Sequence, residues 1–126
     1  MPSASLQYWQ NERLPRLNEV QAQLAASRAL APLNPRLGEE NLRAYIVLLS
    51  AHFQGFCRDL HAESALSISM RVRPSLRLLV QAQFTAHRAL DRGHPNPENI
   101  RKDFERFGFR MQLNTADPAT RHACII

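Results

Sequence analysis

The sequence is poor in the residues from which small-molecule and metal sites are most often built. Its two cysteines, Cys57 and Cys124, lie far apart, so they indicate neither a disulfide framework nor a pair of metal ligands. The four glycines are scattered, which excludes a glycine-rich phosphate loop. The five histidines show no repeated short spacing. We therefore predict no metal site and no cofactor.

Long apolar runs are also missing. No segment approaches the roughly 20 apolar residues needed to span a bilayer, and the N-terminal segment 1–16 contains no apolar signal sequence. We expect no membrane partner and a cytoplasmic location. A chain of 126 residues with 44% hydrophobic content fits one domain, 1–126, in which 110–126 is expected to form an irregular tail.

Lysine is nearly absent, because Lys102 stands against fifteen arginines. The net charge of +5 arises entirely after residue 64, since the first 64 residues hold six arginines and six acids. No acid occurs between residues 65 and 90, and that segment contains Arg71, Arg73, Arg77 and Arg88. We predict these four as nucleic-acid-binding residues, because such a patch suits a polyanion such as RNA. The alternative is a solvated helix face, since charge runs alone are weak signals.

Apolar spacing and helix-end signals predict an all-α protein with four helices. The first begins between Ser5 and Leu14 and ends near Ala29, with Pro15 tolerated only near its start. A loop containing Pro32, Pro35 and Gly38 follows, and the second helix runs from about Gly38 to Glu63. Its apolar stripe has helical spacing over five turns. The stripe comprises Leu42, Tyr45, Ile46, Leu49, Phe53, Phe56, Cys57 and Leu60.

The second half of the chain predicts two shorter helices after a connection at Ser64–Arg73. One begins at Pro74 and stops at Gly93. Its expected inward residues are Leu76, Leu79, Val80, Phe84 and either His87 or Leu90. The other has Asn96 as its N-cap, Pro97 in its first position and Glu98 in its first turn. Its expected stripe is Ile100, Phe104 and Phe107, with Gly108 at its end and Phe109 folding back.

Three side chains in or near the second helix have plain structural interpretations. His52 lies beside the apolar stripe and is predicted to be a core or interface histidine. His61, with Glu63, lies near the predicted helix end, where a histidine favours the macrodipole, so a capping role is expected. Cys57 is predicted to be a core residue.

The second helix also carries a specific string of residue types. The small residue Ala51 lies two positions before Phe53, Gln54, Gly55 and Phe56, and the basic–acidic pair Arg58–Asp59 follows after Cys57. This string resembles the second helix of the HEPN superfamily, which includes RNA-cleaving toxins and defence nucleases. Segment 91–109, DRGHPNPENIRKDFERFGF, is similar to the loop and short helix that precede the last long helix of many such proteins. The resemblance covers most of residues 41–109.

The resemblance implies an antiparallel four-helix HEPN-like bundle, a homodimer, RNA as substrate and an antitoxin or other neutralising protein as partner. Catalytic members carry an Arg and, four to six residues later, a His on the last helix. Here that helix is not found, and Arg121 and His122 are adjacent. Arg88 and His94 have a compatible spacing, but Gly93 and Pro95 flank the histidine and the helix is the wrong one. We therefore predict no catalytic residue.

The expected protein is a HEPN-like domain that lacks its C-terminal helix and is catalytically incomplete. A truncation or frameshift before that helix would give the same ending. Two alternatives remain open. One is a non-catalytic helical protein-protein interaction module, and the other is a basic RNA-binding protein without nuclease ancestry.

Overall fold

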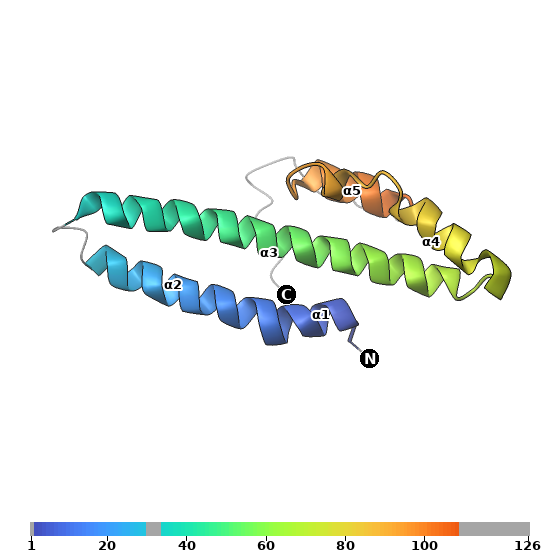
Figure 1. The fold of residues 1–126 in the computed structure, drawn as a ribbon, viewed down its shortest axis with the longest axis horizontal. Helices are drawn as coiled ribbons and strands as arrows, with labels where there is room; N and C mark the ends of the chain where they lie inside the picture. Colours follow the sequence, from blue (N-terminus) through green and yellow to red (C-terminus); the bar gives the residue numbers. More distant parts are fainter. Residues whose placement is uncertain (1, 30–33, 109–126) are drawn as a thin grey trace, which may run out of the picture.

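A computed structural model describes residues 2–29 and 34–108, and all regular structure in these ranges is helical. Helices α1 and α2 lie along one side of α3, and α4 and α5 lie along the other side (Figure 1). The elements in chain order are α1 Ala4–Tyr8, η1 Trp9–Arg13, α2 Leu14–Ala29, α3 Pro35–Ser69, η2 Pro74–Leu76, α4 Arg77–Thr85, η3 Ala89–Asp91 and α5 Pro97–Glu105. The predicted all-α class is confirmed.

The first three elements form one continuous helix, so Pro15 lies in its middle and the expectation that it would lie near the start is wrong. Ser3 caps the helix, its Oγ accepting a hydrogen bond from the Leu6 N–H at 3.1 Å. The η1 segment is a π-helical turn in which the Leu14 N–H donates to the Trp9 carbonyl. Proline lacks an N–H and crowds the carbonyl four residues before it. The wider turn immediately before Pro15 accommodates that conflict.

Helix α3 is longer than predicted at both ends. The Asn34 side chain accepts from the Leu37 N–H at 3.2 Å and Pro35 occupies the first turn, so the predicted loop through Gly38 ends at Asn34. The predicted connection from Ser64 is also wrong, because the helix continues to Ser69. Two buried small residues explain this extension, since Ala65 and Ser69 lie four residues apart on the face that α4 contacts.

The predicted third helix is broken into η2, α4 and η3. Helix α4 ends at Thr85, eight residues before Gly93, and His87 adopts a φ of 55°. The carboxylate of Asp103 holds η3 by accepting from the N–H groups of Ala89 and Leu90, both at 2.8 Å. A partner on α5 therefore fixes this break, and the local sequence does not show it.

Of the residues predicted to point inward from this region, Leu90 is fully buried, as expected. Leu76 and Leu79 are 46% and 66% exposed, so their assignment to the core is wrong. The short α4 contacts α3 mainly, and its other side faces outward.

Helix α5 begins and ends as predicted. The Asn96 side chain accepts from the Asn99 N–H at 2.7 Å, and Pro97 and Glu98 occupy the first turn. Gly108 follows the helix with a φ of 84°, a conformation that glycine adopts without strain. The predicted contact of Phe109 and the predicted tail 110–126 lie outside the described residues.

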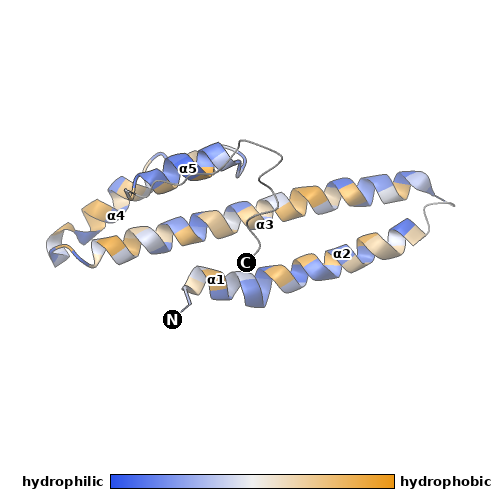
Figure 2. Cartoon of the chain, turned by 180° about the vertical axis from the view of Figure 1, so that it is seen from behind, coloured by the Kyte–Doolittle hydropathy of each residue, from blue (hydrophilic) through white to orange (hydrophobic). Residues whose placement is uncertain are grey.

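The core is divided between two opposite sides of α3. Its buried hydrophobic residues within the described ranges are Leu17, Leu24, Cys57, Ala65 and Leu90. Part of the predicted apolar stripe of α3 is exposed instead, with Ile46 at 56%, Leu49 at 40% and Phe53 at 38%. Figure 2 shows apolar residues along α3 and α4, and several of them are exposed. Helices pack on two sides of α3, and no described helix covers the exposed apolar residues between them.

Candidate functional site

The four predicted basic residues do not converge. Arg71 follows the end of α3, Arg73 precedes η2, and Arg77 begins α4, whereas Arg88 precedes η3. Arg71 and Arg73 are exposed, and Arg77 is half-buried.

Arg88 is bound within the protein. Its Nε lies 3.0 Å from Asp91 Oδ2, its second terminal nitrogen donates to Asp91 Oδ1 at 3.2 Å, and its side chain is 14% exposed. Asp91 also pairs with Arg58 at 2.9 Å. Asp91 thus holds Arg88 against the protein, which leaves Arg71 and Arg73 as the exposed cations of the predicted patch.

His61 is a fully buried residue in the middle of α3, so the predicted capping role is wrong. The error follows from the helix end, which lies at Ser69 and not at Glu63. The His61 Nε2 lies 3.2 Å from the Asp103 carbonyl, so Nε2–H is the donor, and Nδ1 has no partner. Burial lowers the pKa of His61 below 6.5, and the positive charges of Arg88 and Arg106 lower it further.

The Arg88–His94 pair forms no site. Arg88 is engaged with Asp91, and His94 is exposed in the segment between η3 and α5, beyond the helix end as expected. Within the described residues an Arg–His contact joins Arg92 and His87 at 3.2 Å, but the pair is exposed and the histidine precedes the arginine, the reverse of the HEPN order. The described residues also contain no group of His, Cys, Asp and Glu side chains that could hold a metal ion.

Cys57 is buried, as predicted. Burial raises the pKa of its thiol from 9.0 to about 11, so the reactive thiolate is scarce at neutral pH. It is a packing residue and not a nucleophile.

Two pockets lie along α3. The first, the apolar pocket, has a volume of ≈ 470 Å³ and is bounded by η1 and by the segment before α5. Its lining residues are Trp9, Ile46, Leu49, Ser50, Phe53 and Pro95. The Trp9 ring meets Phe53 edge-on at 6.5 Å between centroids and Phe56 at 5.3 Å.

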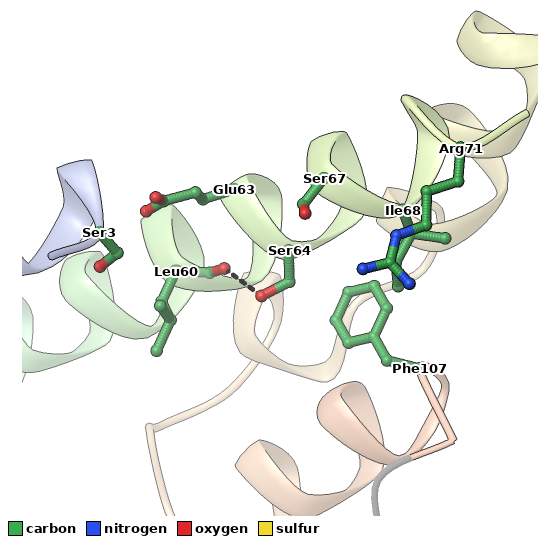
Figure 3. A pocket seen from close by; sticks show the side chains of 8 residues that line it. All are labelled: Ser3, Leu60, Glu63, Ser64, Ser67, Ile68, Arg71 and Phe107. Carbon is green, nitrogen blue, oxygen red and sulfur yellow. Dashed lines mark hydrogen bonds between the residues drawn. The ribbon is translucent and has the colours of Figure 1, made fainter. Parts of the chain in front are cut away.

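The second pocket, the Arg71 pocket, has a volume of ≈ 440 Å³ and combines a cation with hydroxyl groups. Figure 3 shows it between the start of α1, the last turns of α3 and the end of α5. Its lining residues are Ser3, Leu60, Glu63, Ser64, Ser67, Ile68, Arg71 and Phe107. Among these eight side chains the drawn hydrogen bond is the one that Ser64 Oγ donates to the Leu60 carbonyl, at 2.8 Å.

Glu63 lines this pocket but is already satisfied. Its two carboxylate oxygens accept from the N–H groups of Ala4 and Ser5, each at 3.0 Å, and from Ser5 Oγ at 2.6 Å. The hydrogen bonds from the side chain and backbone of Ser5 lower the pKa of Glu63 below 4.5, so it is ionised at neutral pH. It fastens α1 to α3 and is not available to a ligand.

The two pockets repeat along α3. Ile46, Leu49 and Ser50 of the apolar pocket stand eighteen residues before Ser64, Ser67 and Ile68 of the Arg71 pocket. Eighteen residues are five turns of an α-helix, about 27 Å, so both sets project in the same direction. Both pockets therefore lie on the same side of α3, which we call the open face of α3.

No protein-family model, curated protein or solved structure matches the chain. The described helices include none with the length and apolar character that a membrane crossing requires. The HEPN resemblance thus stays a prediction from the residues, and the open face of α3 is the candidate site.

Proposed function

We propose that this chain is a HEPN-like helical interaction module that binds an amphipathic helix of a partner protein along the open face of α3. The observation that carries the proposal is the five-turn repeat of the two pockets on that face. Together they form an elongated surface about 27 Å long, which is the length of an 18-residue helix. A compact ligand would occupy one pocket and leave the other empty.

The spacing of the apolar residues on α3 supports a helix as the occupant. The residues that follow the alternating four- and three-residue spacing of a coiled-coil seam are Leu42, Ile46, Leu49, Phe53, Phe56 and Leu60. This spacing keeps one stripe in contact with a second, nearly parallel helix. Part of the seam already packs on α1 and α2, and its exposed part faces the apolar pocket. A partner helix with its own apolar stripe would complete that packing.

The proposed module is HEPN-like in fold, but its role is to bind a protein and not to cleave RNA. The resemblance to RNA-cleaving toxins also implies a protein partner. The partner class that follows is a full-length RNA-cleaving toxin or its neutralising protein, each of which could supply a helix. Two alternatives to a partner helix on the open face are a second copy of this chain and residues 109–126, and the experiments below distinguish them.

Calorimetry with a synthetic probe tests the proposal. The probe is a 25-residue helical peptide with leucine at the seam positions and charged residues elsewhere. We expect saturable binding to the full chain and a loss of about tenfold or more in affinity for Ile46→Lys, because burying a lysine in the interface removes apolar contact. Leu78→Lys is the matched control, since Leu78 is 80% exposed on α4 and lines neither pocket.

Equal losses in both variants, or no saturable binding, would overturn the proposed function. Light scattering at tens of micromolar separates the remaining occupants. A dimer that becomes a monomer in the Ile46→Lys variant would assign the open face to a second copy. A monomer in which removing residues 109–126 creates the binding site would assign it to that segment.

RNA binding is the second candidate, and the exposed Arg71 and Arg73 favour it. A filter-binding titration at several salt concentrations measures it directly. Binding that weakens steeply with salt, and less steeply in a variant with both arginines replaced by glutamine, would support this function. No binding at low salt would exclude it.

A further inference from the structure

We infer that the Arg71 pocket is a carboxylate-binding subsite that reads an acidic side chain in the first turn of the helix occupying the open face of α3. This inference rests on the proposed function and names the chemistry and direction of its partner. It is carried by the guanidinium of Arg71, which lines the pocket and forms no ion pair with an acid of the described ranges. A carboxylate subsite at one end of the apolar surface would determine which end of the bound helix lies there.

Two serines of α3 and the arginine that follows the helix line this pocket together. Ser64 and Ser67 are three residues apart and project from the same side of α3, and Arg71 lies two residues beyond the end of the helix. The guanidinium of Arg71 points back over the pocket toward the ring of Phe107 (Figure 3). It offers several N–H donors in a planar fork that fits a carboxylate.

One hydroxyl group adds a donor to this fork. The Ser3 hydroxyl is already engaged, since its Oγ accepts from the Leu6 N–H and its hydrogen bond helps to lower the pKa of Glu63. Ser67 forms no drawn hydrogen bond with the other seven residues of the pocket. We expect an anionic oxygen beside Arg71 to receive a hydrogen bond from Ser67 as well as from the guanidinium.

The acceptors within the pocket are already occupied. The carboxylate of Glu63 accepts from the N–H groups of Ala4 and Ser5 and from Ser5 Oγ, and the Ser3 hydroxyl also lowers its pKa. Glu63 also stands eight residues from Arg71, about 12 Å along the helix axis. No acidic residue of the described ranges forms an ion pair with Arg71. The positive charge of Arg71 thus has no acidic partner among the described residues. We expect a carboxylate of the bound helix to supply one.

The preference of helices for acids in their first turn gives the expected direction of the bound helix. Arg71 lies just beyond the C-terminal end of α3, so a helix that brings its first turn to Arg71 runs antiparallel to α3. Acidic side chains are favoured in the first turn of a helix, where they complement the positive end of its dipole. The expected partner sequence has Glu or Asp in its first turn and an apolar anchor about eighteen residues later, at the apolar pocket. The aliphatic Leu60 and Ile68 would contact the methylene groups of the acid.

Three versions of the synthetic helix test the subsite by calorimetry at low salt. One has Glu in the first turn, one has Gln at that position, and one has the Glu moved to the last turn. We expect the first to bind about five- to tenfold more tightly than the other two, because a charge-assisted hydrogen-bonded pair forms only there. In Arg71→Gln the three should bind alike.

Arg73→Gln is the matched control. Arg73 is exposed and two residues away, but it does not line the pocket. The preference for Glu should survive in this variant, which separates a built site from general attraction to a basic surface. A charge swap adds a positive test, because Arg71→Glu should prefer a probe with Lys in the first turn.

Each outcome is decisive. Equal binding of the Glu and Gln probes by the unaltered chain would overturn the subsite and leave the open face of α3 as a purely apolar docking surface. Equal loss of the preference in Arg71→Gln and Arg73→Gln would overturn it as well, and equal binding of the first-turn and last-turn Glu probes would overturn the antiparallel direction. If no probe binds, the proposed function fails together with the inference.

Discussion

At the scale of single residues, His61 makes stability depend on pH. Its pKa is below 6.5 in the folded protein because burial and two nearby arginines disfavour the imidazolium. The unfolded chain therefore binds more protons as the pH falls below 6.5, and the free energy of unfolding decreases. Urea denaturation at a series of pH values should show this loss beginning below pH 6.5.

His61→Gln provides the control for this prediction. Glutamine can still donate to the Asp103 carbonyl but does not titrate, so the variant should be flat over that pH range. Glu63 contributes a separate loss below pH 4.5, because its pKa is lowered and its stabilising charge disappears on protonation. A wild-type profile that is flat between pH 7 and pH 5 would contradict the assignment of the buried neutral histidine.

Position 55 favours glycine because the side chain of Arg13 occupies the space that a Cβ would need. A Cβ at Gly55 would collide with the Arg13 guanidinium, which pairs with Asp59 at 2.8 Å. Gly55→Ala gains about 0.5–1 kcal/mol of helix propensity but displaces this side chain, so we expect little net change. In an Arg13→Ala background the same substitution should stabilise by about 0.5–1 kcal/mol. Thermal denaturation of the four proteins of this cycle measures the difference, and an equal effect in both backgrounds would refute the steric account.

At the scale of elements, Asp103 joins α5 to η3. It is 2% exposed and accepts two backbone hydrogen bonds through its two oxygens. Asp103→Asn replaces one acceptor by an NH₂ group that faces an N–H donor, so we expect a loss of about 2–3 kcal/mol in unfolding free energy. Chemical denaturation checks the magnitude. Asn96→Asp at the start of the same helix keeps a capping acceptor and should cost little.

Local signals in the sequence predicted some elements and missed others. The ends of α5 were predictable because Asn96, Pro97 and Gly108 act on neighbouring residues. The end of α3 was not, since Leu66, Ile68 and Met70 alternate as in a strand and the burial of Ala65 and Ser69 depends on distant α4. The break of α4 depends on Asp103, which lies many residues later. The helix can contain Pro15 in its middle because a π-helical turn precedes the proline, and that turn has no clear sequence signal.

The candidate site was predictable in part. The apolar stripe of α3 and the basic character of Arg71 could be read from the sequence. Their arrangement could not, because it depends on which faces of α3 the other helices cover. Two further features of the site were not predicted. Arg88 forms an ion pair with Asp91, and Ser3 lies near the end of α3.

At the scale of the whole molecule, the described helices leave much of α3 and α4 uncovered, so ligand binding should add substantially to stability. A helix that binds only the folded chain raises its free energy of unfolding by about 2.7 kcal/mol at a concentration of 100 times Kd. Calorimetric melting with and without the first-turn Glu probe should show this as an increase in Tm. Ile46→Lys should abolish the increase, whereas Leu78→Lys should retain it.

Trp9 allows the most direct measurement of the central claim. It is the sole tryptophan of the chain, it is half-exposed, and it lines the apolar pocket on the open face of α3. Titration with the first-turn Glu probe, which itself lacks tryptophan, should shift its emission to shorter wavelength and saturate at one probe per chain, because a bound helix removes water from the indole. An unchanged emission at concentrations where calorimetry records binding would place the helix elsewhere and contradict the account.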